Sequence, residues 1–170
     1  MFNPFRNYEK KIAKLLINKE LALSCAESCS GGLISSMLTD ISGSSAFIIV
    51  NFVTYANEAK EKYLFVDKKI LEEYGAVSEQ TAFQIAEGLL KQGNTDIALG
   101  ITGIAGPTGG SREKPVGLAY VGIANKDKVS VYKILMPKWL PRKFMKYCFA
   151  KKALSYLLKF VEENYGEGND

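Results

Sequence analysis

The sequence predicts an α/β protein with three layers, α/β/α, built around a mixed and mostly parallel sheet. Amphipathic segments at helical spacing alternate with short apolar runs as far as residue 101, a pattern typical of strands connected by helices. The run at 47–55 is almost continuously apolar, which favours a parallel strand covered on both faces. Two later runs are joined by a polar tripeptide at 125–127, which predicts a hairpin and therefore an antiparallel strand.

The helices are predicted from apolar stripes and from residues that suit helix ends. The first stripe consists of Tyr8, Ile12, Leu15 and Leu16, and the expected later helices cover 30–39, 58–64, 68–74, a segment between Ser78 and Gly93, and a segment from about 141. Asn57, Asp67 and Ser78 are the expected N-caps, because their side chains accept hydrogen bonds from the first helical amides. The expected strands cover 21–23, 47–55, 96–101, 116–124 and 128–135.

Length and composition indicate one domain. A chain of 170 residues that is 47% apolar is long enough for one full core and short for two. We expect a single domain over 1–165 and a flexible tail over 166–170. The net charge of +4 is too mild to indicate nucleic acid by itself.

The basic residues are nevertheless unevenly distributed. Residues 133–160 contain eight basic side chains and no acidic one, namely Lys133, Lys138, Arg142, Lys143, Lys146, Lys151, Lys152 and Lys159. Such a run is typical of a solvated helix face, and the alternative is a contact with a phosphate-bearing ligand or partner.

The absence of histidine excludes several kinds of chemistry. Ser-His-Asp and Cys-His catalysis and most zinc sites all require this side chain. A catalytic base must then be Lys, Tyr, Asp or Glu, and we expect neither a metal nor another cofactor. The three cysteines, Cys25, Cys29 and Cys148, form no disulfide framework, which favours the reducing cytoplasm. We find no signal peptide and no apolar run long enough for a membrane span.

The stretch at 25–32 is the first candidate site, because small residues there follow a strand-like run and open a helix. The amide groups of a first helical turn lack partners in the helix and can hold an oxyanion. Ser28, Cys29 and Ser30 lie close to these amide groups, and Gly31 and Gly32 permit a tight turn. The alternative is that a serine only caps the helix and that the glycines only ease the turn.

Three unusual segments each follow a predicted strand, at 28–32, 55–60 and 102–110. Loops beyond the carboxyl ends of parallel strands share one crevice, so these segments meet if their strands are parallel. Lys60 falls in the first turn of a helix, where the helix dipole disfavours a cation and lowers its pKa. Without histidine, a lysine near a serine is a natural general base, and the alternative is an ordinary surface lysine.

The segment at 102–110 is the most glycine-rich part of the chain, and it lacks the ending of a P-loop. Gly103 and Gly106 permit the backbone to approach a ligand closely. The alternative is a long flexible connection, and the residues alone leave both open.

Six blocks along the chain resemble one known family. They are AESCSGG at 26–32, GSS at 43–45, TYANEAK at 54–60, GAVS at 75–78, TGIAGP at 102–107 and EKPVG at 113–117. Together they resemble the C-terminal domain family of the competence/damage-inducible protein CinA, which includes nicotinamide mononucleotide deamidases. The resemblance implies a three-layer α/β/α fold and hydrolysis of the carboxamide of nicotinamide mononucleotide to nicotinate mononucleotide and ammonia.

The resemblance also implies roles for individual residues. Ser28 corresponds to the family nucleophile and Lys60 to its base, with Tyr55 beside them. Thr102 lies in the facing loop. Arg142 stands at the position where the family has an arginine. Its side chain is interpreted either as a phosphate contact or as a solvated cation.

The loop sequences and the family resemblance together predict seven substrate-binding residues. They are Ser30, Gly31, Gly32, Thr102, Gly103, Gly106 and Arg142. Cys29 is the rival nucleophile, since a thiol at a helix N-terminus is easily activated.

Two further functions are open at this point. The family pattern has serine at Ala56 and Gly-Asp at Leu140-Pro141, and these departures favour a pyridine-nucleotide-binding module with reduced turnover. The basic run would serve a DNA-associated competence accessory protein, which we consider less consistent with the mild net charge. We expect a homo-oligomer with a small-molecule substrate.

Overall fold

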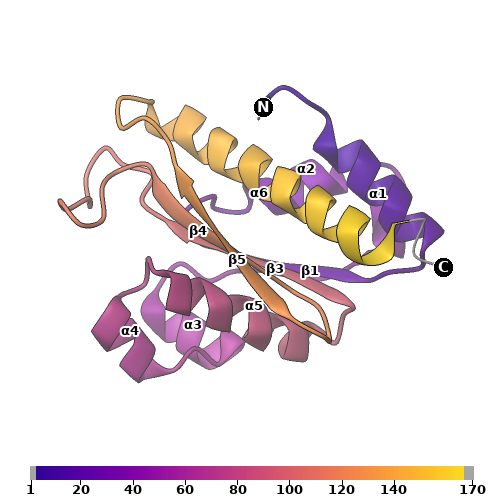
Figure 1. Cartoon of the computed structure of the whole chain (residues 1–170), viewed down its shortest axis with the longest axis horizontal. Helices are drawn as coiled ribbons and strands as arrows, with labels where there is room; N and C mark the ends of the chain where they lie inside the picture. The colour runs from indigo at the N-terminus through magenta and orange to yellow at the C-terminus, as the bar shows by residue number, and fades with distance from the viewer. Residues whose placement is uncertain (1–2, 167–170) are drawn as a thin grey trace.

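Residues 3–166, which the computed structural model describes, form one five-stranded sheet between two layers of helices (Figure 1). The strands are β1 (Leu23–Glu27), β2 (Ile48–Val53), β3 (Ile97–Gly103), β4 (Leu118–Ala124) and β5 (Val129–Leu135). The helices are α1 (Tyr8–Asn18), α2 (Leu33–Thr39), α3 (Asn57–Leu64), α4 (Lys68–Tyr74), α5 (Glu79–Gly93) and α6 (Arg142–Tyr165), with a 3₁₀ turn η1 (Ser44–Ala46). The tail expected over 166–170 lies, beyond Gly166, outside the described residues.

The sheet has the order β2-β1-β3-β4-β5. β1 is parallel to both of its neighbours, β2 and β3, whereas β4 is antiparallel to β3 and β5. Every strand except β4 therefore runs in the same direction, which confirms the prediction of a mixed and mostly parallel sheet. The predicted hairpin joins β4 to β5, and the Asn125 side chain accepts hydrogen bonds from the amides of Asp127 and Lys128 in its turn.

One helical layer consists of α1, α2 and α6, and the other of α3, α4 and α5 (Figure 1). α5 packs very closely on the centre of the sheet. A Cβ atom at Gly122 would lie 2.2 Å from the carbonyl oxygen of Ala82, so only glycine permits this approach. Separate apolar clusters fill the two faces, with Ile12, Leu16 and Phe149 in one and Ile85 and Leu89 in the other. The three predicted layers are thus present.

The prediction that the strand at 47–55 is covered on both faces is wrong. β2 lies at the edge of the sheet, and the side chains of Ile49 and Val53 are 57% and 55% exposed. The apolar character of this strand reflects β propensity and cover on one side only. No structural partner for its outer edge is present among residues 3–166.

Two helix starts also differ from the prediction. α2 begins at Leu33 rather than near residue 30, because Gly31 and Gly32 adopt φ values of +65° and +91°. β1 correspondingly extends to Glu27, so the first half of the small-residue stretch is strand. The N-cap of α3 is Ala56 rather than Asn57, and no side chain caps this helix.

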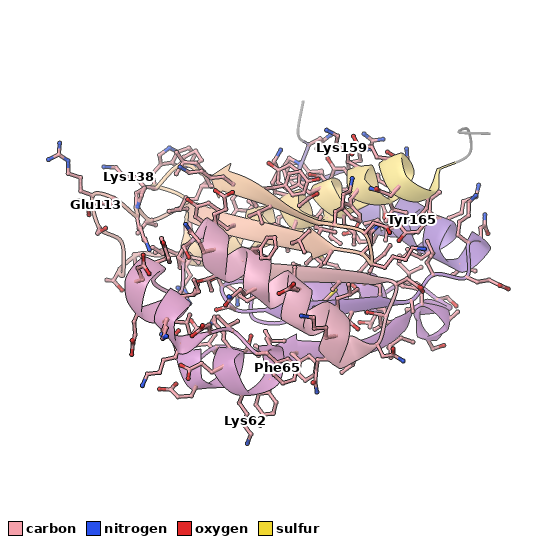
Figure 2. The ribbon with its side chains drawn as sticks, turned by 60° about the horizontal axis from the view of Figure 1, so that its bottom comes forward. Lys62, Phe65, Glu113, Lys138, Lys159 and Tyr165 are labelled. Atoms are coloured by element: carbon pink, nitrogen blue, oxygen red, sulfur yellow. The ribbon has the colours of Figure 1, made fainter. Side chains whose placement is uncertain are left out.

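α6 carries six of the eight residues of the basic run, but the run is not one solvated face. Lys138 and Lys159 project into solvent far apart from each other (Figure 2). Lys151 is 5% exposed and donates hydrogen bonds from Nζ to both carboxylate oxygens of Glu9, at 2.8 and 3.1 Å. This buried ion pair joins α6 to α1. None of the helices in the described part of the chain combines the length and apolarity that a bilayer span demands.

We predict that Lys151→Met lowers the free energy of unfolding by about 3–5 kcal/mol, because the Glu9 carboxylate is left buried without its partner. Urea denaturation at pH 7 measures this change. Lys159→Met is the matched control on the same helix, since its pair with Glu163 is exposed and contributes at most about 0.5 kcal/mol. In Glu9→Leu/Lys151→Met, which removes both charges, most of the lost stability should return. Equal effects in Lys151→Met and the control would contradict a stabilising role for the pair.

Candidate active site

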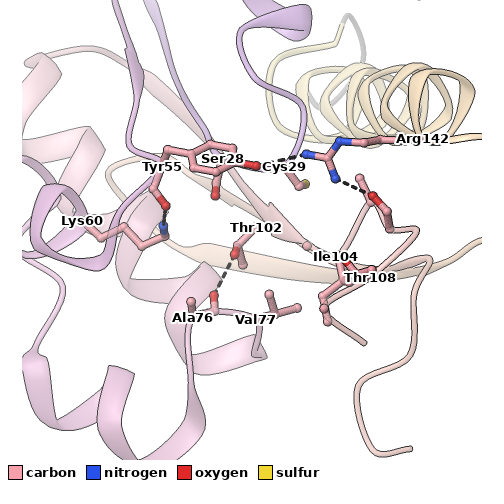
Figure 3. Close-up of a pocket in the computed structure, with 14 residues that line it drawn as sticks. Ser28, Cys29, Tyr55, Lys60, Ala76, Val77, Thr102, Ile104, Thr108 and Arg142 are labelled. Atoms are coloured by element: carbon pink, nitrogen blue, oxygen red, sulfur yellow. Dashed lines mark hydrogen bonds between the residues drawn. The ribbon is translucent and has the colours of Figure 1, made fainter. Parts of the chain in front are cut away.

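The carboxyl ends of β1, β2 and β3 meet at one edge of the sheet, where a cavity of about 270 Å³ opens (Figure 3). The loops that follow these three strands contribute most of its lining, as the sequence predicted. Seven of the ten candidate residues line it, and they are Ser28, Tyr55, Lys60, Thr102, Gly103, Gly106 and Arg142. Ser30, Gly31 and Gly32 do not. Ala76, Val77 and Ile104 complete the walls with apolar surface.

Ser28 is presented by a tight turn between β1 and α2. The chain leaves β1 at Glu27, and the carbonyl oxygen of Ser28 accepts a hydrogen bond from the Gly31 amide at 3.1 Å. The two glycines that follow then adopt left-handed conformations, which residues with a Cβ atom rarely reach. This turn leaves the Ser28 side chain half-buried at the cavity wall.

The carboxylate of Glu27 occupies the start of α2. It is fully buried and accepts five hydrogen bonds, three on one oxygen and two on the other. The donors on Oε2 are the Ser30 hydroxyl at 2.6 Å and the amides of Gly32 and Ile34, each at 3.0 Å. The donors on Oε1 are the amide and the hydroxyl of Ser35, at 2.8 and 2.6 Å. This anion lies at the positive end of the helix dipole and accepts hydrogen bonds from three of its first amides.

Part of the predicted oxyanion site at residues 30–32 is hydrogen-bonded within the protein. The Gly31 amide bonds to Ser28 and the Gly32 amide to Glu27, and the Ser30 hydroxyl also points at Glu27. The Ser30 hydroxyl and the Gly32 amide are thus occupied by the protein's own carboxylate, and the Gly31 amide by the Ser28 carbonyl. Sequence reasoning missed this role of Glu27, because the carboxylate comes from the last residue of β1, five residues before the N-cap Gly32.

Lys60 is buried beside Ser28 in the cavity wall. Its side chain is among the largest that are fully enclosed, with 1% of the residue exposed. The Nζ atom donates hydrogen bonds to the carbonyl oxygens of Thr54 and Tyr55, at 2.9 and 3.2 Å. No carboxylate pairs with it among residues 3–166. Burial lowers the pKa of Lys60, although the charges of Cys29 and Glu58 act in the opposite direction.

Cys29 lines the same cavity but is poorly suited to act as a nucleophile. The residue is 5% exposed, and burial raises the pKa of its thiol to about 12. The charge of Glu27 adds to this increase, and two backbone amides oppose it. Because the thiolate is the reactive form, a thiol with such a pKa is almost entirely protonated near neutral pH. Burial thus disfavours Cys29 as the nucleophile.

Arg142 joins three segments at the mouth of the cavity. Its Nη1 atom donates to the carbonyl oxygen of Gly106 at 2.6 Å, and Nη2 donates to the Tyr55 hydroxyl at 3.1 Å (Figure 3). The arginine is the first residue of α6, whose N-cap Pro141 provides no side-chain hydrogen bond. A guanidinium beside an uncapped helix start is a favourable place for an anion.

Thr102 supports the opposite wall. Its hydroxyl donates to the carbonyl oxygen of Ala76 at 2.7 Å and so fixes the short loop before α5 against the end of β3 (Figure 3). The threonine is 1% exposed. Its main effect in this structure is therefore to place the apolar wall of Ala76 and Val77.

The electrostatics of the cavity are positive. Lys60 and Arg142 line it, and no acidic side chain of residues 3–166 does so. In the same part of the chain, no cluster of three or more His, Cys, Asp or Glu residues could hold a metal ion. An anionic ligand, or one that develops negative charge in a reaction, suits this lining.

Fold and site together define a small α/β protein with a serine and a buried lysine in one cavity beyond parallel strand ends. The chain belongs to the CinA family: the CinA C-terminal domain matches residues 6–161. A protein of Thermoanaerobacter pseudethanolicus, provisionally named competence-damage inducible, is 51% identical over 128 residues, which cover 75% of this chain and 31% of the relative. A CinA-like protein of Syntrophus aciditrophicus is 44% identical over 153 residues, covering 90% of this chain and 36% of the relative.

The solved structures agree with this assignment. The competence/damage inducible protein CihA from Agrobacterium tumefaciens has a TM-score of 0.84 at 38% identity, covering 94% of this chain and 97% of the other. A CinA superfamily protein from Escherichia coli has a TM-score of 0.83 at 31% identity, with 90% of each chain covered. The chain spans about a third of the length of the curated relatives it matches.

The lowered pKa of Lys60 predicts how stability depends on pH. Between this pKa and the ordinary value of 10.5, the unfolded chain binds more protons than the folded protein, so the free energy of unfolding rises with pH in that window. Lys60→Met lacks this rise, and its stability relative to the natural protein should decline as pH increases through the window. Urea denaturation between pH 7 and pH 10 measures the difference. Lys62→Met, at an exposed lysine of α3, serves as the control. A pH-independent difference for Lys60→Met would contradict a lowered pKa.

Proposed function

We propose that this chain is an amidohydrolase that converts nicotinamide mononucleotide to nicotinate mononucleotide and ammonia. The observation that carries the proposal is the buried amine of Lys60 in the same cavity as Ser28, with a lowered pKa and without a carboxylate partner. A neutral lysine amine can accept the proton of a serine hydroxyl, which histidine does in other hydrolases. Membership in the CinA family supports the same reaction.

The proposed reaction has two halves. In the first, Ser28 Oγ attacks the carboxamide carbon while Lys60 Nζ takes the hydroxyl proton. Lys60 then delivers this proton to the amide nitrogen, the C–N bond breaks, and ammonia leaves an acyl ester on Ser28. In the second half, water attacks the ester carbon and gives one proton through Lys60 to Ser28 Oγ. The carboxylic acid that leaves then loses its own proton to solvent and becomes the carboxylate product. The scheme requires neither a metal nor a cofactor.

The cavity lining supports an anionic nucleotide substrate. Arg142 can contact the phosphate of the mononucleotide, and the uncapped amides at the start of α6 add to the same positive field. Thr102, Gly103 and Gly106 provide the wall that would face the pyridine and ribose. Tyr55 accepts hydrogen bonds from Lys60 Nζ on its carbonyl oxygen and from Arg142 on its hydroxyl, and so connects the base with the proposed phosphate contact. Binding energy from the remote phosphate can then orient the carboxamide.

A pyridine-nucleotide-binding module with little turnover is the second candidate. The observation in its favour is that Ala56, at the N-cap of α3, has no hydroxyl where the family pattern has serine. Binding of the mononucleotide without ammonia release would support it. DNA association has less support, since Lys151 of the basic run is consumed in the Glu9 pair. The cytoplasmic location and the homo-oligomer stay predictions, the former supported by three unpaired cysteines.

We predict that Ser28→Ala lowers kcat for ammonia release from nicotinamide mononucleotide by about four orders of magnitude or more, because the acyl-enzyme cannot form. Cys29→Ala is the control and should retain activity within about tenfold, since its protonated thiol takes no part. Loss of activity in Cys29→Ala with retention in Ser28→Ala would show that Cys29, and not Ser28, is the nucleophile.

The phosphate contact yields a separate prediction. Arg142→Ala should lower kcat/KM for the mononucleotide by about 10- to 100-fold, the range expected for a hydrogen bond between charged groups. Activity on the phosphate-free riboside should change by less than about threefold. Lys143→Ala removes a neighbouring exposed cation and controls for general charge. Equal losses on both substrates would show that Arg142 acts by holding Tyr55 and Gly106 instead.

A further inference from the structure

The buried carboxylate of Glu27 has no cationic partner among residues 3–166. Burying a carboxylate without a counter-ion is costly, and the five hydrogen bonds at the start of α2 offset that cost. A serine or an aspartate at the N-cap itself would satisfy helix amides with less desolvation. The carboxylate of Glu27 therefore does more than cap the start of α2.

We infer that Glu27 is the positioning residue of the site: its carboxylate fixes the turn that aims the Ser28 hydroxyl at the substrate. The inference rests on the proposed function, in which Ser28 is the nucleophile. Glu27 touches no cavity surface and takes part in no bond that forms or breaks.

The hydrogen bonds of Glu27 constrain the turn on both sides of its flexible centre. The carboxylate holds the hydroxyl of Ser30 before Gly31 and the amide of Gly32 after it. The Gly31 amide in turn bonds to the carbonyl oxygen of Ser28. Without the carboxylate, two consecutive residues with positive φ would leave this segment with many accessible conformations.

The backbone of Glu27 extends the same constraint to the base. Its carbonyl oxygen accepts a hydrogen bond from the Thr54 amide at 2.9 Å, and the Thr54 carbonyl accepts one from Lys60 Nζ at 2.9 Å. One residue thus links the turn of the nucleophile with the loop that holds the base. A displacement of about 1 Å between such groups can lower a rate about 100-fold.

The charge of Glu27 has a second consequence that supports the role. It adds to the burial that raises the pKa of Cys29, so the thiol next to Ser28 stays protonated. The connection between Glu27 and the base is the chain of hydrogen bonds through Thr54.

Two graded variants test the inference. Glu27→Gln keeps the shape but turns an amide NH₂ toward donors that need an acceptor, and we expect kcat to fall about 100-fold with KM changed less than about threefold. Ser35→Ala keeps the carboxylate and removes one donor, and we expect a fall of about tenfold in kcat. Ser36→Ala is the matched control, because this neighbouring hydroxyl on α2 is exposed and makes no hydrogen bond with residues 3–166.

A substrate-independent measurement accompanies the kinetics. Phenylmethylsulfonyl fluoride forms a covalent ester with an activated serine, and mass spectrometry follows its attachment to Ser28. We expect Glu27→Gln and Ser35→Ala to be labelled more slowly than the natural protein, in the same order as their kcat values. Melting temperatures identify a variant that fails to fold. If Glu27→Gln does not fold, the result for Ser35→Ala alone tests the positioning role.

The outcomes separate the positioning role from the proposed reaction. If the natural protein is labelled at Ser28 but releases no ammonia, and the variants are labelled slowly, the positioning role stands and the substrate assignment fails. If the variants lose thermal stability but keep the labelling rate and kcat of Ser36→Ala, Glu27 is only a helix cap and the inference is overturned. Absence of Ser28 labelling in the natural protein overturns both.

Discussion

The separate burial of two opposite charges, Glu27 and Lys60, is the constraint on which the site depends. Each charge is satisfied by the backbone rather than by the other charge. Amides and hydroxyls at the start of α2 surround the carboxylate, and carbonyl oxygens of the loop after β2 receive the ammonium. A direct pair would raise the pKa of the lysine and keep it protonated. Because the charges stay apart, burial lowers the pKa of Lys60 instead.

This separation also limits which groups at the start of α2 are left for a substrate oxyanion. The first amides of α2 are a favourable place for negative charge, and Glu27 already supplies it. A substrate oxyanion would have to compete with a carboxylate that is covalently part of the preceding strand. The cavity also presents a cation, Arg142, at the start of α6. The starts of α3 and α6, which no side chain caps, remain open to an anion, and Arg142 adds a cation at the second of them.

Much of this architecture could be predicted from the sequence, because hydrophobic periodicity and parallel-strand topology are local signals with a fixed geometric consequence. The meeting of Ser28, Lys60 and Thr102 follows from strand order alone once β1, β2 and β3 are parallel. The exposure of β2 could not be predicted, since edge and central positions depend on the whole sheet. The hydrogen bonds to the first amides of α2 depend on the direction in which the Glu27 side chain points. The sequence does not specify that direction.

The position of Arg142 depends on packing far from the cavity. The arginine contacts Gly106 and Tyr55, which precede it by 36 and 87 residues, so no local pattern could place the three together. α6 brings it there, and that helix is held along its length by the apolar cluster and by the buried pair of Lys151 with Glu9 of α1. Loss of that pair would free α6 to shift against the sheet. Because the mouth of the cavity is tied to the first residue of α6, such a shift would move Arg142 relative to Tyr55 and Gly106. The interface between the first and last helices is thus part of the geometry of the site.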